Sequence, residues 1–453
     1  MSLIDEIILE ETWRDRYSRE GNLHKNLLDI PIPCHGMGLR SKKDLEAFIR
    51  LRLTQPTERL GFCIVQLHKS DNTFVWMSKM LDAEKHKLSP TADGTQLKMF
   101  ADKTMLVVLP STQYTYYYEV DVIDEILASL ETPTFLKTFV KKLKVKAEKI
   151  GNTKSEQFQD WKKQFFEDQW LELNADQKLL DQFITENYNG QNTSNASMLI
   201  PPTPPLVTLA MFYVATKIIE ETTKRAPTST AIYFHLPFSI LKDSDYRKKV
   251  LDYCEKAKNR IIILKIVDID QLLDPDKEEE REAFSEIQDR LCGIRKNDLK
   301  CTILLDGGKL TIPSLARGFD IVTNHFSGKL ESKGGKSRQK NTDPKGFTQY
   351  FINEKLIFYR YKKMIDFAEN QLKLTNGEHG LKCSLPCCKD VKSLKDVNKD
   401  DWNFSITRPH YALNMNEIVK NIASLMHKNQ IQKVNDIILQ SELCVLKHLI
   451  PDV

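Results

Sequence analysis

The 453-residue chain lacks several features that would each assign it to a class of protein. No apolar run reaches the length of about 18 residues that a transmembrane helix needs, so we expect no membrane partner. Its first twenty residues, MSLIDEIILEETWRDRYSRE, lack the basic end, apolar stretch and small-residue cleavage site of a signal peptide. We therefore expect a cytoplasmic protein. The net charge is only +4, so any contact with nucleic acid must come from locally clustered basic residues.

The sequence also has no C-x-x-C pair, and most of its nine cysteines are isolated, which argues against a disulfide framework. The isolated cysteines are Cys34, Cys63, Cys254, Cys292, Cys301 and Cys444. The other three fall within the stretch KCSLPCCKD at 382–390. In a reducing compartment such a cluster is typical of a metal site or a redox site rather than of disulfide bridges.

The clustered cysteines predict a zinc site. Three thiolates from Cys383, Cys387 and Cys388 and the imidazole of His410 would complete a tetrahedral zinc shell. His379 is an alternative ligand, because adjacent cysteines seldom both bind one ion. The competing interpretation is three cysteines without a metal in an exposed loop. A redox role ranks third, since C-x-x-C is absent.

The order of apolar and amphipathic stretches predicts an α/β fold. Six runs such as MLVVLP (105–110) and CTILLD (301–306) are nearly continuously apolar, and helical stretches alternate with them from residue 198 onward. This alternation is typical of parallel strands covered by helices. We predict a (β/α) barrel of the TIM type, and an open doubly wound sheet is the alternative.

Length and composition predict more than one structural region. With 453 residues, 41% of them hydrophobic and 28% charged, the chain is of ordinary globular composition and too long for a single ordinary core. We expect a small α+β region over 1–100. The barrel is expected over 101–350, with a helical insertion at 120–190. A zinc-knuckle and helical region would follow over 351–453.

The carboxyl ends of the expected strands contain the candidate catalytic residues, because active sites of parallel α/β folds lie there. Asp306 ends CTILLD and precedes two glycines, which would let a ligand approach the backbone. Its carboxylate is a candidate nucleophile or general base, and a turn or helix cap is the alternative role. His235, inside IYFHLPF, is interpreted as a satisfied core histidine.

A basic loop follows the last expected strand. Residues 328–346 read GKLESKGGKSRQKNTDPKG, in which only Glu331 and Asp343 are acidic. A flexible loop of this charge at a barrel mouth is suited to contact phosphates, whereas the alternative is a solvated loop without a ligand. The candidate nucleic-acid-binding residues are Lys329, Lys333, Lys336, Arg338 and Lys340.

Two stretches give the sequence a family resemblance. CSLPCC followed by RPHYALNMNEIV resembles the late zinc knuckle of the tRNA-guanine transglycosylase family, with its histidine at the start of a helix. LARGFDIVTNHF resembles the segment of that family in which Gly-φ-Asp precedes the strand that carries the catalytic aspartate. The resemblance implies a TIM barrel, bound zinc, a nucleic-acid substrate and exchange of a guanine for a deazaguanine base. It adds Asp320, the aspartate of Gly-Phe-Asp, to Asp306 as a candidate catalytic residue.

The sequence departs from that family at the nucleophile. The family's aspartate comes three residues after the Gly-φ-Asp aspartate, and Thr323 stands at that offset here. Asp306 is then the best placed substitute. Two other classes stay open: a non-catalytic barrel that binds nucleic acid, a partner subunit or a second copy of itself, and a barrel hydrolase or lyase that acts on small molecules.

Overall fold

The computed structural model describes eleven longer stretches of the chain and a few single residues. The longer stretches are 32–39, 59–69, 105–193, 196–227, 229–274, 276–298, 300–325, 349–352, 357–360, 404–428 and 430–439. The single residues are Asp44, Ala47, Phe48, Leu51 and Leu385.

A seven-stranded, all-parallel sheet forms the centre of the described structure. Its spatial order is β3-β2-β1-β7-β6-β5-β4. The strands of this sheet that come first and last along the chain, β1 and β7, are therefore neighbours in its middle. The strands are β1 (Cys34–Gly38), β2 (Phe62–Gln66), β3 (Met105–Leu109), β4 (Ile232–Leu236), β5 (Ile261–Ile266), β6 (Cys301–Leu305) and β7 (Ile321–His325). A separate antiparallel pair consists of β8 (Gln349–Ile352) and β9 (Ile357–Arg360).

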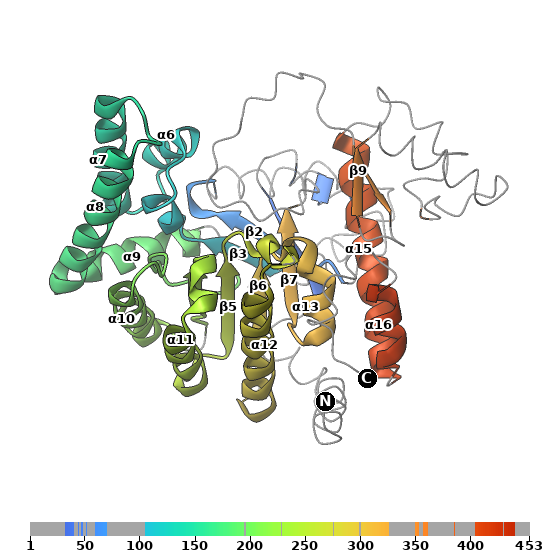
Figure 1. Cartoon of the computed structure of the whole chain (residues 1–453). Helices are drawn as coiled ribbons and strands as arrows, with labels where there is room; N and C mark the ends of the chain where they lie inside the picture. Colours follow the sequence, from blue (N-terminus) through green and yellow to red (C-terminus); the bar gives the residue numbers. More distant parts are fainter. Residues whose placement is uncertain are drawn as a thin grey trace, which may run out of the picture.

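Helices precede and follow these strands and cover the outside of the sheet (Figure 1). The α-helices are α6 (Val120–Ala128), α7 (Thr134–Ile150), α8 (Glu156–Ala175), α9 (Gln177–Thr193), α10 (Leu209–Arg225), α11 (Ser244–Lys256), α12 (Glu278–Asp298), α13 (Thr311–Arg317), α15 (Phe404–His427) and α16 (Ile431–Leu439). Short 3-10 helices follow the strands: η1 (Leu67–Lys69), η2 (Ser111–Thr115), η3 (Phe238–Lys242), η4 (Ile269–Leu273) and η5 (Gly308–Leu310). Within the described residues, no helix combines the length and apolar composition needed to cross a membrane.

The segment 197–200 connects the two edges of the curled sheet. Ser197 N donates to the carbonyl of Leu106 in β3 (2.8 Å). On the other side, Leu199 N donates to Ser229 O and Leu199 O accepts from Ala231 N (both 2.9 Å), immediately before β4. Leu199 and Thr230 form an isolated parallel bridge. Hydrogen bonds therefore run from strand to strand around the whole sheet, which is consistent with a TIM-like barrel.

Alternate residues of the strands form an apolar interior, the inner cluster, as expected for a sheet curled around its own core. Its members come from all seven strands and from the connecting segment, and include Ile64, Val107, Ile200, Tyr233 and Ile263. The intervening residues pack outward against the helices in a second, larger cluster. Both faces of each strand are therefore buried, which explains why the strands read as nearly continuous apolar runs.

Hydrogen bonds at their amino ends fix where several helices start. The side chain of Asp243 accepts from Tyr246 N (2.9 Å) at the start of α11, and Ser155 accepts from Phe158 N (3.3 Å) at the start of α8. These contacts satisfy amide groups that have no partner within the first turn. At the other end of α7, Gly151 adopts φ 71°, the left-handed conformation that commonly ends a helix.

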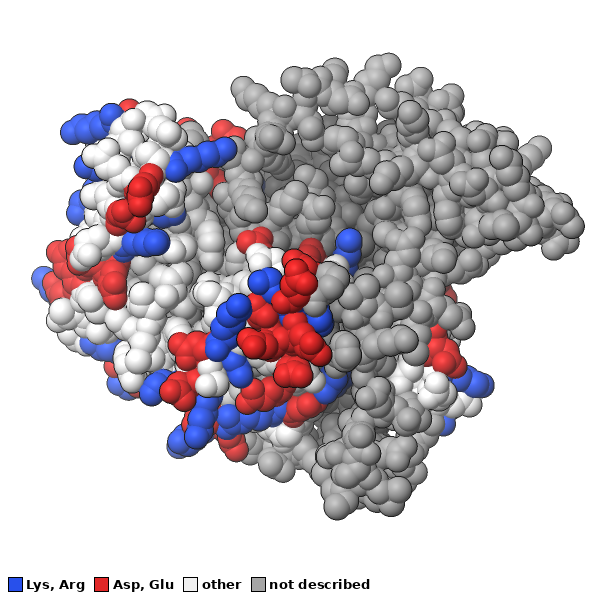
Figure 2. Space-filling model, in the orientation of Figure 1, with Lys and Arg blue, Asp and Glu red and all other residues white. Residues whose placement is uncertain are grey.

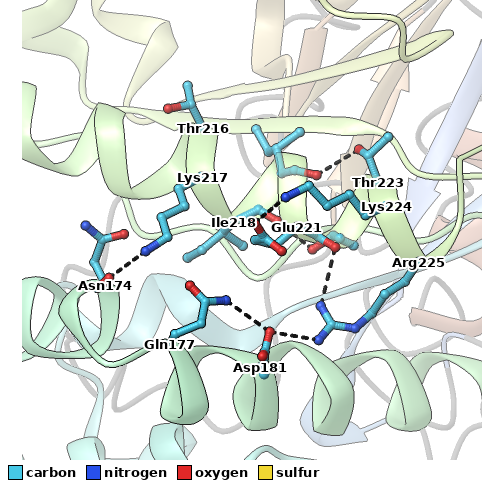
Figure 3. Close-up of polar contacts among 12 residues, drawn as sticks. Asn174, Gln177, Asp181, Thr216, Lys217, Ile218, Glu221, Thr223, Lys224 and Arg225 are labelled. Carbon is cyan, nitrogen blue, oxygen red and sulfur yellow. Dashed lines mark hydrogen bonds and ion pairs between the residues drawn. The ribbon is translucent and has the colours of Figure 1, made fainter.

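Residues 120–193, where a helical insertion is expected, form helices α6 to α9, which lie to one side of the sheet (Figure 1). Helix α10 joins this insertion to the barrel through contacts shown in Figure 3. Lys217 Nζ donates to Asn174 O (2.7 Å), and Arg225 donates to Asp181 Oδ1 (3.1 Å). Apolar residues of α8, α9 and α10 also pack in one buried cluster around Trp170 and Phe183. The insertion is therefore a packed part of the described structure.

The six strands expected from apolar runs are present, the second of them as the short segment around Leu199. The two further strands β1 and β2 come from the expected N-terminal α+β region and lie between β3 and β7. The boundary expected at residue 100 therefore falls inside the sheet. Helix α15 from the expected C-terminal region packs against β1, where Tyr411 meets His35 edge-on (ring centroids 5.9 Å apart).

Candidate functional site: the carboxyl mouth of the barrel

Asp306 and Lys265 form an ion pair at the carboxyl ends of two neighbouring strands. Lys265 Nζ lies 2.8 Å from Asp306 Oδ2, and the two side chains are 14% and 15% exposed. Asp306 directly follows β6, and Lys265 is the fifth residue of β5. The pair is therefore largely shielded from water at the edge where parallel α/β folds bind their ligands.

The backbone of Asp306 is held in an unusual conformation by β7. Its φ is 53°, in the left-handed region that aspartate and asparagine tolerate better than most residues. Asp306 N donates to Thr323 Oγ1 (3.1 Å), and Gly307 N donates to Thr323 O (2.9 Å). Thr323 therefore orients Asp306.

Gly307, the first glycine after Asp306, does not have the role expected from the sequence, which was to let a ligand approach the backbone. A Cβ atom at Gly307 would overlap with Cγ1 of Val322. The missing side chain therefore lets the chain pass closely over β7 rather than leaving space for a ligand. Gly308 adopts φ 56°, so it serves the turn into η5.

Lys265 enters the mouth from inside the barrel. It continues the inward series of Ile261 and Ile263, both of which belong to the inner cluster. Its register neighbours are His235 in β4 and Leu305 in β6. Lys265 Nζ also donates to Gln113 Oε1 (3.2 Å), which comes from η2 after β3. The ammonium group thus links three strand ends of the barrel.

His235 lies beside this ion pair and is 2% exposed. The expectation of a buried histidine is confirmed, but its ring nitrogens have no hydrogen-bond partner among the described residues. Burial lowers its pKa well below the usual value, and the positive charge of Lys265 lowers it further while Asp306 acts in the opposite direction. The ring is therefore neutral near pH 7, with one nitrogen able to donate and the other to accept.

Tyrosines surround the same site. The ring of Tyr117 lies 5.4 Å from that of His235 at an interplanar angle of 33°. Burial raises the pKa of Tyr117, and the charges of Tyr116 and Asp268 raise it further. Burial likewise raises the pKa of Tyr233, with Asp306 as the next contribution. Both hydroxyls stay protonated at neutral pH and can donate. We refer to Gln113, Tyr117, His235, Lys265, Asp306 and Thr323 as the mouth cluster.

Ser111, another residue at a strand end, has a different environment. Its Oγ lies 2.8 Å from His68 Nδ1, and His68 Nε2 lies 3.4 Å from Glu125 Oε2. Contacts with His68, and then Lys69, lower the pKa of Glu125 to about 2 although burial acts against this. Ser111 is 1% exposed. The structure therefore places the buried Ser111 in a chain of polar contacts that runs through His68 to the half-exposed Glu125 and ties α6 to η1.

Asp320 lies at the opposite end of the barrel from Asp306. It precedes β7 and is fully buried, and its Oδ2 accepts from Thr302 N (2.9 Å) and from Thr302 Oγ1 (3.1 Å). Ile303 pairs with Ile321, so Asp306 is about four residues further along the strands, roughly 13 Å at the usual rise per residue. The structure does not bring the two candidate catalytic aspartates together.

The predicted zinc ligands fall largely outside the described residues, and only His410 can be placed. It is buried in α15, where Asn414 Nδ2 lies 3.2 Å from His410 Nδ1 and donates to His410 O (2.7 Å). This makes Nδ1 an acceptor, whereas a zinc-bound histidine normally donates through its second nitrogen. Among the described residues, no group of three or more His, Cys, Asp or Glu side chains is arranged to hold a metal.

The expected nucleic-acid-binding residues, Lys329, Lys333, Lys336, Arg338 and Lys340, also lie outside the described residues. Where the described surface is visible in Figure 2, acidic and basic side chains are interspersed. The acidic ones are densest around α12, whose first turn contains Glu278, Glu279 and Glu280. The visible described surface therefore carries charges of both signs.

Sequence reasoning found Asp306 but not its partner. The available signal was a single lysine in the strand IIILKI, at an alternate position that continues the inward isoleucines. A charge at such a position has to reach the mouth or find a buried counter-ion. Comparison with known proteins finds no matching family model, no matching curated protein and no matching solved structure.

Proposed function

We propose that this protein is a transglycosylase-like enzyme that exchanges a guanine for a deazaguanine base in RNA or DNA, with the mouth cluster as its active site. The observation that supports the proposal most directly is the shielded carboxylate of Asp306, held 2.8 Å from Lys265 at the carboxyl end of β6. The family resemblance of LARGFDIVTNHF supplies the reaction.

In this proposal Asp306 acts on the sugar carbon from which the base departs. That carbon gains positive charge as the glycosidic bond breaks, and a nearby carboxylate can bond to it or stabilise its charge. Lys265 compensates the charge of Asp306 while the site is empty. Thr323 keeps the carboxylate in place through the backbone of Asp306.

The aromatic side of the mouth cluster is suited to a planar base. Tyr117 and His235 offer neighbouring ring faces, and His235 offers one donor and one acceptor on its ring. An enzyme that acts on a base within nucleic acid must first take that base out of the stack, and aromatic surfaces offset part of that cost.

The test is a base-exchange assay with labelled guanine on both DNA and RNA. Asp306→Asn retains size and the tolerance for left-handed backbone but removes the charge. We expect turnover to fall by about 100-fold or more with an unchanged melting temperature. Asp289→Asn, which removes an exposed partner of Arg317, is the matched control. Equal turnover in Asp306→Asn and the wild type would eliminate Asp306 as the nucleophile.

A second candidate is a non-catalytic transglycosylase-like barrel that binds nucleic acid or a partner subunit. It is favoured by Thr323, which is fully buried and hydrogen-bonded where the family has its nucleophile. The same assay separates the two candidates. Tight nucleic-acid binding by the wild type and by Asp306→Asn, with no exchange by either, would support the binding protein.

Zinc stays part of the proposal through the cysteines. We propose one ion per chain, bound by Cys383, Cys387 or Cys388, and His410. Leu385, inside the same stretch, packs against the larger apolar cluster between the strands and the helices. Metal analysis of the purified protein should find about one zinc per chain. Full zinc content in His410→Ala would remove His410 from the shell, as its contact with Asn414 leads us to consider.

The basic loop supplies the proposed contact with the nucleic-acid backbone. Changing Lys333, Lys336, Arg338 and Lys340 to Ala should weaken binding and flatten its salt dependence. Each phosphate contact that is lost should reduce the slope of log K against log salt by about one. An unchanged slope would leave the loop as solvated surface.

A further inference from the structure

Lys265 has the surroundings of a nucleophilic amine. Its ammonium lies 2.8 Å from a carboxylate that can accept a proton, and 3.2 Å from the amide oxygen of Gln113. Its side chain is 14% exposed, so few water molecules compete for it. A structural lysine in this chain looks different: Lys300 donates to the carbonyls of Cys254, Glu255 and Ala257 at the end of α11.

The imidazole of His235, next to Lys265, is suited to bind a polar ligand. His235 is the register neighbour of Lys265, and both ring nitrogens of His235 are buried without a partner among the described residues. Burying a polar atom without a hydrogen-bond partner is unfavourable, so such an atom points to a ligand that supplies hydrogen bonds. Hydroxyl groups can both donate and accept, which matches the two nitrogens of a neutral imidazole.

We infer that Lys265 forms an imine with the aldehyde carbon of an open-chain sugar bound at the barrel mouth. Asp306 takes one proton from the ammonium, and the free amine adds to the aldehyde carbon to give a carbinolamine. Asp306 then returns the proton to the hydroxyl group, which leaves as water. The balance is Lys–NH₃⁺ plus R–CHO giving Lys–NH⁺=CHR plus H₂O, with no oxidant or reductant consumed.

The inference uses the same site as the proposed base exchange but does not depend on it. Loss of a base to water leaves a pentose whose open-chain form carries an aldehyde, whereas base exchange itself leaves the sugar carbon bonded to the new base and releases no aldehyde. Any other polyhydroxylated aldehyde would have the same chemistry. Both the imine and the base exchange would use the mouth cluster. They differ in the side chain that bonds to the sugar carbon, which is Lys265 in the imine and Asp306 in the exchange.

The experiment traps the imine by reduction. The full-length protein is incubated with 2-deoxyribose, and separately with an oligonucleotide that contains one abasic site, in the presence of cyanoborohydride. Peptide mass spectrometry should find one sugar added at Lys265. Lys265→Arg retains the charge but cannot form an imine, so the adduct should be absent. Lys163→Arg, at an exposed position on α8, is the matched control and should label like the wild type.

Asp306→Asn tests the proton transfer. Without a base beside the amine we expect labelling of Lys265 to slow by about 100-fold. Equal labelling of Lys265→Arg and the wild type, or labelling spread evenly over surface lysines, would overturn the inference. Labelling at Lys265 without any base exchange would leave the inference intact and reject only the proposed function. Base exchange that survives in Lys265→Arg, with no trapped sugar in the wild type, would reject the inference and leave the proposed function intact.

Discussion

The two ends of the barrel contain charged residues in opposite kinds of environment. At the amino end, Asp320 accepts from the backbone and the hydroxyl of Thr302, and Lys300 donates to three carbonyls of α11. At the carboxyl end, Asp306 and Lys265 rely on each other, next to a histidine whose nitrogens have no partner among the described residues. Charges that bind the backbone hold the fold, whereas charges that bind each other can exchange partners when a ligand arrives.

This contrast explains why the two aspartates that the sequence offers as catalytic candidates differ in role. The backbone N–H of Thr302 needs the carboxylate of Asp320, because no water can replace it in a fully buried site. Asp306 is partly exposed, and its own backbone rather than its carboxylate is tied to Thr323. Its carboxylate pairs with the side chain of Lys265, so we expect its replacement to cost the fold less than that of Asp320.

The largest expected effect concerns stability at the amino end. Asp320→Ala should reduce the free energy of unfolding by about 3 kcal/mol, because it leaves a buried N–H and a hydroxyl without their acceptor. Asp306→Asn should reduce it by no more than about 1 kcal/mol, since asparagine tolerates the left-handed backbone and can still accept from Lys265. Urea unfolding of both variants measures the difference.

The contrast between the two ends of the barrel would be wrong if Asp306→Asn lost more stability than Asp320→Ala. A larger loss in Asp306→Asn would mean that the mouth ion pair supports the fold, and the active-site proposal would lose its structural basis. Asp289→Asn again serves as the control, because it removes a carboxylate that is 58% exposed and should change stability by about 0.5 kcal/mol or less.

The next effect is the pH dependence contributed by two buried histidines. Burial lowers the pKa of His35, on the outer side of β1, to about 3 and lowers that of His235 well below 6.5. The unfolded chain therefore binds more protons below pH 6.5, so stability falls as pH falls. Once the pH is well below 6.5, His35 should remove about 1.4 kcal/mol per pH unit, or roughly 1.6 kcal/mol between pH 6.5 and 5, and His235 should act in the same direction.

Urea unfolding of the wild type, His35→Gln and His235→Gln at both pH values tests this. Each substitution should remove the contribution of one histidine to the slope of the unfolding free energy against pH. This holds whatever the substitution does to stability at pH 7. A saturating ligand that donates to the ring of His235 should lower its pKa further, which extends that histidine's share of the slope to lower pH and leaves the share of His35 unchanged. An unchanged slope in His235→Gln would show that its ring is already protonated or solvated in the folded protein.

The sequence predicted most of the barrel, because buried parallel strands read as apolar runs. It did not predict β1, CHGMG, which has only one strongly apolar side chain. Gly36, one of its two glycines, is required by packing: a Cβ there would lie 2.6 Å from both Phe62 Cδ1 and Thr323 Cγ2. Such a strand is defined by its neighbours rather than by its own residues.

The candidate site was predictable only one strand at a time. The position of Asp306 at a strand end was visible in CTILLD, and so was the threonine at residue 323. The pairing of Asp306 with Lys265 depends on the register of β5 against β6, in which Lys265 lies opposite Leu305. Register is set by contacts along whole strands, so no local pattern reveals which charges meet at the mouth.

The smallest expected effects concern the coupling energies of single ion pairs. A shielded pair at the mouth and an exposed pair elsewhere carry the same charges, so any difference between them comes from shielding by the protein. Asp181 and Arg225, which join α9 to α10 in Figure 3, lie 3.1 Å apart with side chains 48% and 30% exposed. A double-mutant cycle with Asp181→Asn and Arg225→Met should give a coupling energy of about 0.5 kcal/mol or less. The cycle with Asp306→Ala, which removes the acceptor altogether, and Lys265→Met should give on the order of 1.5 kcal/mol, because water screens that pair far less.

Added salt provides the internal control for the two cycles. Coupling between Asp181 and Arg225 should decline as salt rises from 0.1 to 1 M, since the Debye length shortens from about 10 to about 3 Å and both groups meet the solvent. Coupling between Asp306 and Lys265 should change little, because low exposure keeps mobile ions away. If the mouth pair were as weak and as salt-sensitive as the surface pair, water would have free access to it. Asp306 and Lys265 would then be an ordinary surface contact, and the chemical difference between the two ends of the barrel would disappear.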